Sequence, residues 1–247
     1  MRVVEGTLPF LEEKEHRIAL VGAGGKTTLM YALAEEYTKR GIRVLVTTTT
    51  HIYQPQKRIW ARSAEEAERL WKAGQYAVVG EEAENGKLKA LTEAELREYM
   101  QIAQVVLVEA DGAKGKPCKV PADFEPVIPD ECDIVIGVMG MDALFRTVGE
   151  ACFREKEAEI HFHLKPERVL TEEVLAEILA SEEGTRKNVG GREYFVVLNK
   201  CDDEERLRSG RKILKMLKAK RVYQGILTSF YAEHILGRER AEIWNRS

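Results

Sequence analysis

Short apolar runs recur along the whole chain, and each ends in glycine or polar residues. They span residues 18–21, 43–46, 77–80, 105–108, 134–138, 194–198 and 222–227. The runs are continuous rather than alternating, which is typical of strands that are buried on both faces. Between them, Leu29, Leu33 and Tyr37 recur at helical spacing, and Gly41 follows as a C-cap. The pattern predicts an α/β fold in which a mostly parallel sheet of about seven strands has helices on both faces.

The spacing of these runs predicts one domain over residues 1–247. Ser63 and Thr92 begin capping boxes, and residues 84–87 are typical of a hairpin turn. Residues 60–100 are therefore expected to form a decorated crossover, a connection between parallel strands that carries additional helices and a hairpin. Residues 145–190 are expected to be an irregular insertion that contains one helix, over residues 171–179, where Val174, Leu175, Ile178 and Leu179 form an apolar side. Within it, His161 and His163 would share one face of an extended segment, but no third metal ligand lies close in sequence.

The first apolar run leads into the stretch with the clearest chemistry. Gly22, Ala23, Gly24 and Gly25 form a turn, and Lys26, Thr27 and Thr28 begin a helix. A strand, a glycine turn and a Lys-Thr helix form a phosphate-binding loop, whose backbone N–H groups, helix end and lysine attract phosphates. The full motif would place another glycine at position 20, which is Leu20. The shorter form occurs in Mur-ligase-type ATP enzymes, and the alternative is a glycine turn without a ligand.

Polar groups end the two strands that follow. The run 105–108 leads into Glu109 and Asp111, and Thr27 with either carboxylate, or both, would bind Mg. Asp111 would alternatively orient an attacking water, and Lys26 would neutralise phosphate charge during catalysis. Thr49 or Thr50, after the run 43–46, would contact the γ-phosphate. Alternatively, the two acids are simply solvated at the start of a loop, and the threonines are present because threonine favours strands.

The run 194–198 ends in Asn199, Lys200, Cys201 and Asp202, the N-K-x-D pattern with which GTPases read guanine. The aspartate accepts from the ring N–H and the amino group of guanine, which adenine cannot supply. The alternative is a capped turn before the next helix. Thr228-Ser229-Phe230 would lie behind the base. Together these motifs predict a three-layer P-loop NTPase-like fold that binds a nucleoside triphosphate with Mg, GTP in preference to ATP.

The composition limits the classes of partner and the cellular location that we expect. A net charge of −3 argues against a nucleic-acid-binding surface, and no apolar run approaches the length of a membrane span. The start has no apolar signal core, and the four cysteines are scattered, so we expect a cytoplasmic protein. In the proline-rich stretch 112–130, Lys114, Lys116 and Lys119 would receive an anionic substrate or form a solvated basic loop, while Cys118 is expected to be structural.

With these residues in view, the chain resembles the YqeC family. The resemblance is carried by segments 21–28, 47–50, 109–113, 115–117, 121–126, 140–144 and 199–202. It implies an accessory role in the maturation of molybdenum hydroxylases that carry labile selenium, with such a hydroxylase or its cofactor machinery as client. Cys152-Phe153-Arg154 stands where the family tends to have Val-His-Arg, which leaves Arg154 as a candidate phosphate or substrate contact.

Three functions therefore remain open at the level of sequence. The first is an NTPase, GTPase-like, that serves hydroxylase maturation. The second is an ATP-dependent small-molecule kinase or ligase. The third is a chaperone that is gated by nucleotide without catalysis. The sequence identifies no catalytic base.

Overall fold

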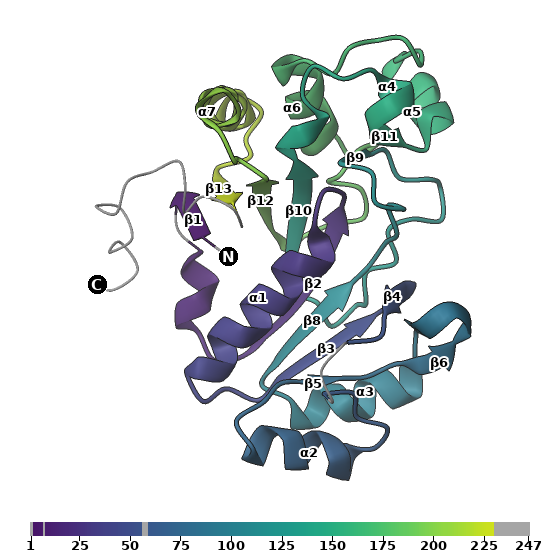
Figure 1. Cartoon of the computed structure of the whole chain (residues 1–247), viewed down its shortest axis with the longest axis vertical. Helices are drawn as coiled ribbons and strands as arrows, with labels where there is room; N and C mark the ends of the chain where they lie inside the picture. The colour runs from purple at the N-terminus through teal and green to yellow at the C-terminus, as the bar shows by residue number, and fades with distance from the viewer. Residues whose placement is uncertain (1, 7, 56–58, 230–247) are drawn as a thin grey trace.

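The computed structural model describes residues 2–6, 8–55 and 59–229. Its centre is an eight-stranded sheet in the order β1-β13-β12-β10-β2-β8-β3-β5 (Figure 1). Seven of these strands run parallel, and β1 joins the edge antiparallel to β13. The predicted α/β fold with a mostly parallel sheet of about seven strands is confirmed. The bounds are β1 Arg2–Glu5, β2 His16–Gly22, β3 Val44–Thr48, β5 Ala77–Val78, β8 Val105–Glu109, β10 Ile134–Gly140, β12 Glu193–Asn199 and β13 Gln224–Ser229.

Helices cover both faces of this sheet because successive strand residues point to opposite sides. Ile18 and Leu20 of β2 belong to the apolar core that includes Leu33 of α1, whereas Ala19 and Val21 belong to the core that includes Leu96 of α3. Helices α6 and α7 cover β10 and β12 on the side of α3. The helices are α1 Lys26–Lys39, α2 Ala64–Lys72, α3 Glu93–Ile102, α4 Val148–Ala151, α5 Glu155–Phe162, α6 Glu172–Ala180 and α7 Glu204–Ala219.

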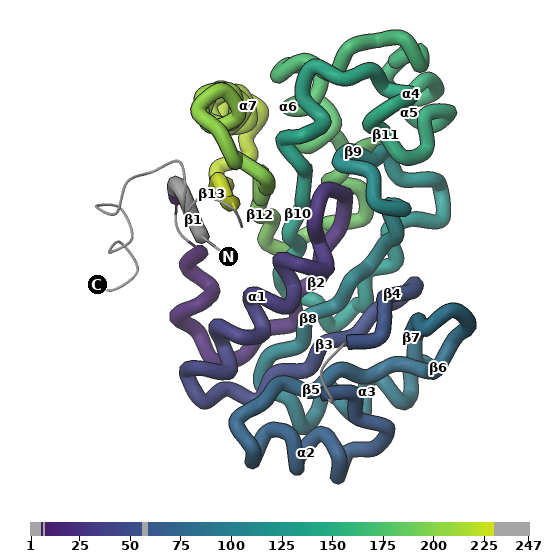
Figure 2. The backbone as a smooth tube through the Cα atoms, in the orientation of Figure 1, coloured from purple at the N-terminus to yellow at the C-terminus, as the bar shows by residue number. Residues whose placement is uncertain are grey.

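Between β3 and β8, the chain adds a small sheet in the order β4-β7-β6, with α2 and α3 (Figure 2). Its strands are β4 His51–Tyr53, β6 Glu81–Ala83 and β7 Lys87–Lys89, and the predicted hairpin turn lies at residues 84–86. Ser63 caps α2 and Thr92 caps α3, as the sequence predicts.

Residues 145–190 are more regular than the sequence indicated. They contain α4, α5, α6 and the short strand β11 (Cys152–Phe153), which pairs with β9 (Cys118–Lys119). The helix expected over residues 171–179 is confirmed as α6, which Thr171 caps. Helices α4 and α5 have only four and eight residues, too few for a clear hydrophobic period. His161 and His163 lie at the end of α5 rather than on a strand. In the described part of the chain, no three potential ligands gather into a metal site.

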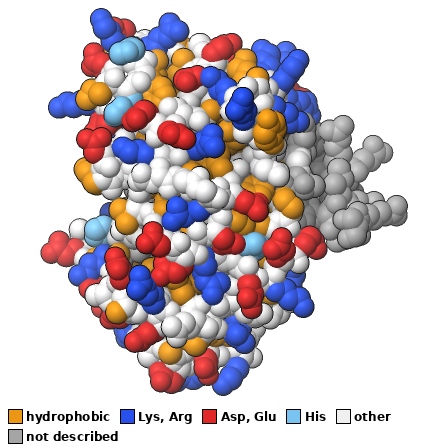
Figure 3. Space-filling view, turned by 180° about the vertical axis from the view of Figure 1, so that it is seen from behind, with side chains coloured by type: hydrophobic (Ala, Val, Ile, Leu, Met, Phe, Trp, Pro, Cys, Tyr) orange, Lys and Arg blue, Asp and Glu red, His pale blue; other side chains and the backbone are white. Residues whose placement is uncertain are grey.

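Among the described residues, no helix combines the length and apolar character needed to cross a membrane. On the face drawn in Figure 3, acidic and basic side chains are interspersed, which matches the small net charge of the whole chain.

Candidate functional site

The polar ends of the central strands gather at one edge of the sheet. Because β2, β3, β8, β10 and β12 are parallel, their carboxyl ends meet there, and ligands of open α/β sheets bind at this edge. The glycine loop joins β2 to α1 at the same edge (Figure 2).

Two glycines of this loop occupy positions that no other residue fits. Gly24 has φ +84°, and a Cβ there would lie 2.1 Å from the backbone nitrogen of Gly140. Gly25 has φ +119°, and its Cβ would lie 2.4 Å from Nδ2 of Asn199. The left-handed backbone and the close neighbours together require glycine. The loop is therefore closely packed against β10 and β12.

The amides of the loop divide into two groups. The N–H groups of Gly22, Ala23 and Gly24 donate to Asp111 Oδ2 (3.1 Å), Val138 O (2.9 Å) and Lys116 O (3.2 Å). The amides at the start of α1, residues 25–28, have no carbonyl one turn earlier in the helix and form its positive end. The Gly24 amide, which the sequence suggested as a phosphate donor, is thus bonded within the protein. The first turn of α1 supplies the anion-binding amides instead.

Lys26 is buried and folded back over the loop. Its Nζ lies 3.1 Å from Asp111 Oδ1 and 4.0 Å from Glu109 Oε1, and it donates to Gly22 O at 2.7 Å. Only 4% of the residue is exposed, so its charge depends on these anionic partners. An ammonium held at the amino end of a helix is placed to contact a phosphate.

Thr27 and Glu109 come together beside Lys26. Thr27 Oγ1 donates to Glu109 Oε2 at 2.6 Å. Burial raises the pKa of Glu109, against the opposing effects of the Lys26 charge and the Thr27 hydrogen bond. Asp111 Oδ1 is also buried, and its charged neighbour is the Lys26 ammonium. A hydroxyl and two carboxylates form the hard oxygen set that suits Mg²⁺, so Thr27, Glu109 and Asp111 fit the metal role that the sequence predicts.

The threonine run after β3 is held against the strand that carries Glu109. Thr48 Oγ1 and the Thr49 amide both donate to Glu109 O, at 2.8 and 3.1 Å. Thr49 Oγ1 donates to Val127 O at 2.8 Å, and the Thr50 amide donates to Thr48 Oγ1 at 2.9 Å. The run therefore borders the site, and its contact with a γ-phosphate stays a prediction.

Asn199 ties the N-K-x-D segment to the glycine loop. Its Nδ2 donates to Gly24 O at 2.9 Å, and Thr228 Oγ1 donates to its Oδ1 at 3.0 Å. Lys200, at φ +61°, pairs with Asp142 through Nζ and Oδ2 at 2.6 Å. The segment thus begins directly beside the loop.

Asp202 is not the cap of the following helix. Asp203 caps α7 by accepting from the Arg206 amide at 2.8 Å. Asp202 instead accepts from Ser229 Oγ at 2.5 Å and lies 3.7 Å from Arg206 Nη1, with 22% of its side chain exposed. A cap does begin α7, but Asp203 supplies it, so capping does not account for Asp202. Phe230, the last residue of the expected base-backing segment, lies outside the described residues.

The lysines of the stretch 112–130 have three different environments. Lys119 is buried, with Nζ 3.0 Å from both Asp111 Oδ2 and Glu125 Oε2. Lys116 donates to the backbone carbonyls of residues 149 and 150, and Lys114 is exposed. Cys118 is buried. Glu125 and Asp142 lie in segments that carry the family resemblance, but the sequence assigned them no role because their partners lie far away along the chain.

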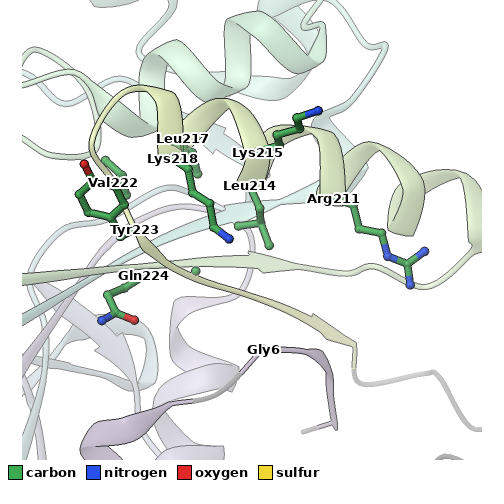
Figure 4. A pocket seen from close by; sticks show the side chains of 10 residues that line it. Gly6, Arg211, Leu214, Lys215, Leu217, Lys218, Val222, Tyr223 and Gln224 are labelled. Carbon is green, nitrogen blue, oxygen red and sulfur yellow. The ribbon is translucent and has the colours of Figure 1, made fainter.

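Two of the hollows in the described part of the chain help to set the limits of the site. One, of about 260 Å³, borders Thr48 and Thr49 between α3 and residues 127–131. The other, of about 290 Å³, is lined by Leu214, Lys218 and Tyr223 (Figure 4). It lies where α7 ends and β13 begins, at the opposite edge of the sheet from the glycine loop. The second hollow is therefore not part of the candidate site.

Comparison with known proteins places this arrangement in a family. Among solved structures, HypB from Helicobacter pylori in complex with nickel is 10% identical, with a TM-score of 0.39 over 90% of this chain and 81% of that one. A likeness at this level supports no inference about activity. The YqeC protein of Escherichia coli (strain K12) is 33% identical over 180 residues, 70% of each chain. The family described as YqeC protein matches residues 18–156. The chain therefore belongs to the YqeC family.

Proposed function

We infer that the protein binds a Mg-nucleoside triphosphate at the glycine loop, and that it prefers GTP to ATP. The phosphate half of this proposal is supported by Lys26 at the start of α1 and by the Thr27–Glu109 hydrogen bond. A bound Mg²⁺ would neutralise phosphate charge, with Thr27, Glu109 and Asp111 as its protein ligands. Phosphoryl transfer is mainly a matter of positioning and charge neutralisation, which these groups supply.

One observation carries the preference for guanine. The hydrogen bond from Asn199 to Gly24 O fixes the N-K-x-D segment against the phosphate loop, while Asp203 rather than Asp202 caps α7. Asp202 is thereby left at the carboxyl edge with a partly exposed carboxylate. A carboxylate accepts from the two adjacent donors of guanine, whereas the corresponding edge of adenine has no amino group there.

In the cell, we propose that this nucleotide cycle serves the maturation of molybdenum hydroxylases that carry labile selenium. The support for this role is the resemblance to the YqeC family. Hydrolysis of the nucleotide would determine when selenium or a cofactor is delivered to the hydroxylase. Turnover that is stimulated by a small acceptor would instead favour the kinase or ligase alternative, and turnover that is stimulated only by a hydroxylase would favour accessory action.

Calorimetric titration tests the nucleotide proposal. We expect wild type to bind Mg-GTPγS more tightly than Mg-ATPγS. Asp202→Asn should weaken GTPγS by about 10- to 100-fold, since a charged hydrogen bond contributes about 1.5–3 kcal/mol. The same variant should gain affinity for xanthosine triphosphate, because the new amide donates where the carboxylate accepted.

Asp203→Asn is the matched control. It removes the same charge one residue away and keeps an asparagine cap on α7, so both nucleotides should bind as they do to wild type. Equal binding of both analogues to wild type, together with no effect of Asp202→Asn, would refute the guanine preference. Lys26→Ala should abolish binding of both.

A further inference from the structure

The loop after β8 presents one cation to solvent beside the phosphate loop. Lys114 has φ +47° and is exposed, and in the described part of the chain its contact is with the Phe153 ring, whose centroid lies 5.5 Å from Nζ. The Gly24 amide donates to Lys116 O, which fixes this loop against the glycine turn. An unpaired ammonium is therefore held close to the nucleotide site.

A second cation reaches the same place from a distant segment. The parallel pairing of β9 with β11 sets Phe153 opposite Lys119, which brings Arg154 beside the loop. The Arg154 guanidinium carbon lies 5.0 Å from the Phe124 ring centroid and 5.1 Å from that of Phe153. Three cationic groups, those of Lys114, Lys119 and Arg154, thus surround one aromatic ring.

Glu125 orients the Arg154 side chain by accepting a hydrogen bond from Nε rather than from the terminal nitrogens. The two bonded atoms, Arg154 Nε and Glu125 Oε2, lie 2.7 Å apart. Burial raises the pKa of Glu125, but hydrogen bonds from Arg154 and Lys119 outweigh this effect and leave the pKa below its ordinary value. Glu125 also shares Lys119 with Asp111, so an ion-paired chain runs from Arg154 to Lys26.

Phe124 supplies an open aromatic face. It is 69% exposed, which is high for a phenylalanine, and the Arg154 guanidinium lies next to its ring. Exposed aromatic rings beside cations are platforms on which flat rings stack, and a planar guanidinium held through Nε suits phosphate or carboxylate oxygens.

We propose that Lys114, Phe124, Phe153 and Arg154, the cationic aromatic cluster, bind a small heteroaromatic phosphate as the second ligand beside the nucleotide. The ring stacks on Phe124, and the phosphate is held by Lys114 and the terminal nitrogens of Arg154. The inference deepens the proposed function by naming the class of its acceptor or effector. It rests on that function for the ligand's role but not for the ligand's binding.

Fluorescence titration with flavin mononucleotide tests this site, with riboflavin as the same ring without phosphate and p-nitrophenyl phosphate as a second probe. Flavin mononucleotide should bind wild type with quenched fluorescence, and riboflavin should bind about a hundredfold more weakly, because it lacks the phosphate that both cations contact. Lys114→Gln and Arg154→Gln should each weaken flavin mononucleotide about tenfold and leave riboflavin unchanged. Phe124→Leu should weaken both, because the ring contact is common to them.

Two controls match these variants. Lys156→Gln removes an exposed charge two residues from Arg154, and Tyr223→Leu removes an aromatic ring that is 68% exposed on another surface. Neither should alter binding. Lys26→Ala should retain flavin binding, which separates the cluster from the phosphate loop and makes the result independent of whether GTP binds. The proposal is overturned if neither phosphate probe binds wild type, if the three cluster variants bind like wild type, or if Lys26→Ala abolishes flavin binding.

Discussion

At the scale of single residues, the site depends on close backbone approach in the glycine loop. Gly24 faces the backbone of Gly140, which cannot rotate away as a side chain could. Asn199 faces Gly25 and is itself held by Thr228. These contacts hold the loop against the ends of β10 and β12, and they make the loop intolerant of even a methyl group.

Gly24→Ala should therefore lower the free energy of unfolding by at least about 2 kcal/mol, since overpacking and a left-handed backbone both add cost. Gly112→Ala is the control, because no atom lies within 4 Å of its added Cβ and its φ is not left-handed. It should change stability by less than about 0.5 kcal/mol. Urea denaturation measures both, and equal stabilities would contradict the close approach.

Two buried thiols should be unreactive in the folded protein. Burial raises the pKa of Cys132 and of Cys201 to about 12. Thiolate is the reactive form, so at pH 8 these groups should react with a disulfide reagent roughly a thousandfold more slowly than an ordinary cysteine. Labelling followed by mass spectrometry identifies the sites, and unfolding in urea should restore fast reaction. Rapid labelling of either residue without unfolding would show that its surroundings open.

At the scale of elements, local signals were enough where a segment was long or capped. The continuous apolar runs predicted the seven parallel strands of the main sheet but not β1, and Ser63 and Thr92 predicted the starts of α2 and α3. Helices α4 and α5 were missed because four and eight residues show no clear period, and the two-residue strands β9 and β11 exist only through their pairing. Unlike β5, which lies in an apolar run, β9 and β11 have no local pattern that marks them as strands.

The cap of α3 offers a test at this scale. Thr92 Oγ1 accepts from the Glu95 amide, and the Thr92 amide donates to the Glu95 carboxylate at 2.9 Å. Thr92→Ala should cost about 1 kcal/mol in the free energy of unfolding, whereas Thr92→Ser keeps the hydroxyl and should be close to wild type. Denaturation of the two variants side by side checks this. If alanine were as stable as serine, the cap would contribute nothing.

At the scale of the whole molecule, the sheet brings together side chains that are far apart in sequence. Parallel strands put Thr27, Glu109 and Asn199 at one edge, and this could be expected from the order of the motifs alone. The pairs Glu125–Arg154 and Asp142–Lys200 could not, because each joins separate loops whose approach is set by packing. The phosphate-loop part of the candidate site was therefore predictable, and the ion pairs formed by the surrounding loops were not.

Ligand binding should stabilise the folded molecule as a unit. At a nucleotide concentration of 100 times Kd, binding adds about 2.7 kcal/mol to the free energy of unfolding, which for a protein of this size raises Tm by roughly 5–10 °C. Thermal denaturation with and without Mg-GTPγS measures the shift. Lys26→Ala should show none, and an equal shift in that variant would place nucleotide binding elsewhere.

The register of β2 also has a consequence for biosynthesis. Ile18 pairs with Leu107 on one side and with Ile134 on the other, and Gly24 is held by Asn199. A ribosome that adds about 5–20 residues per second needs roughly 5–20 s after β2 to make both partner strands. During that time, the apolar strand has neither neighbour and is a segment that chaperones would bind. The strand that leads to the phosphate loop is thus made well before the strands that hold it and its loop in place.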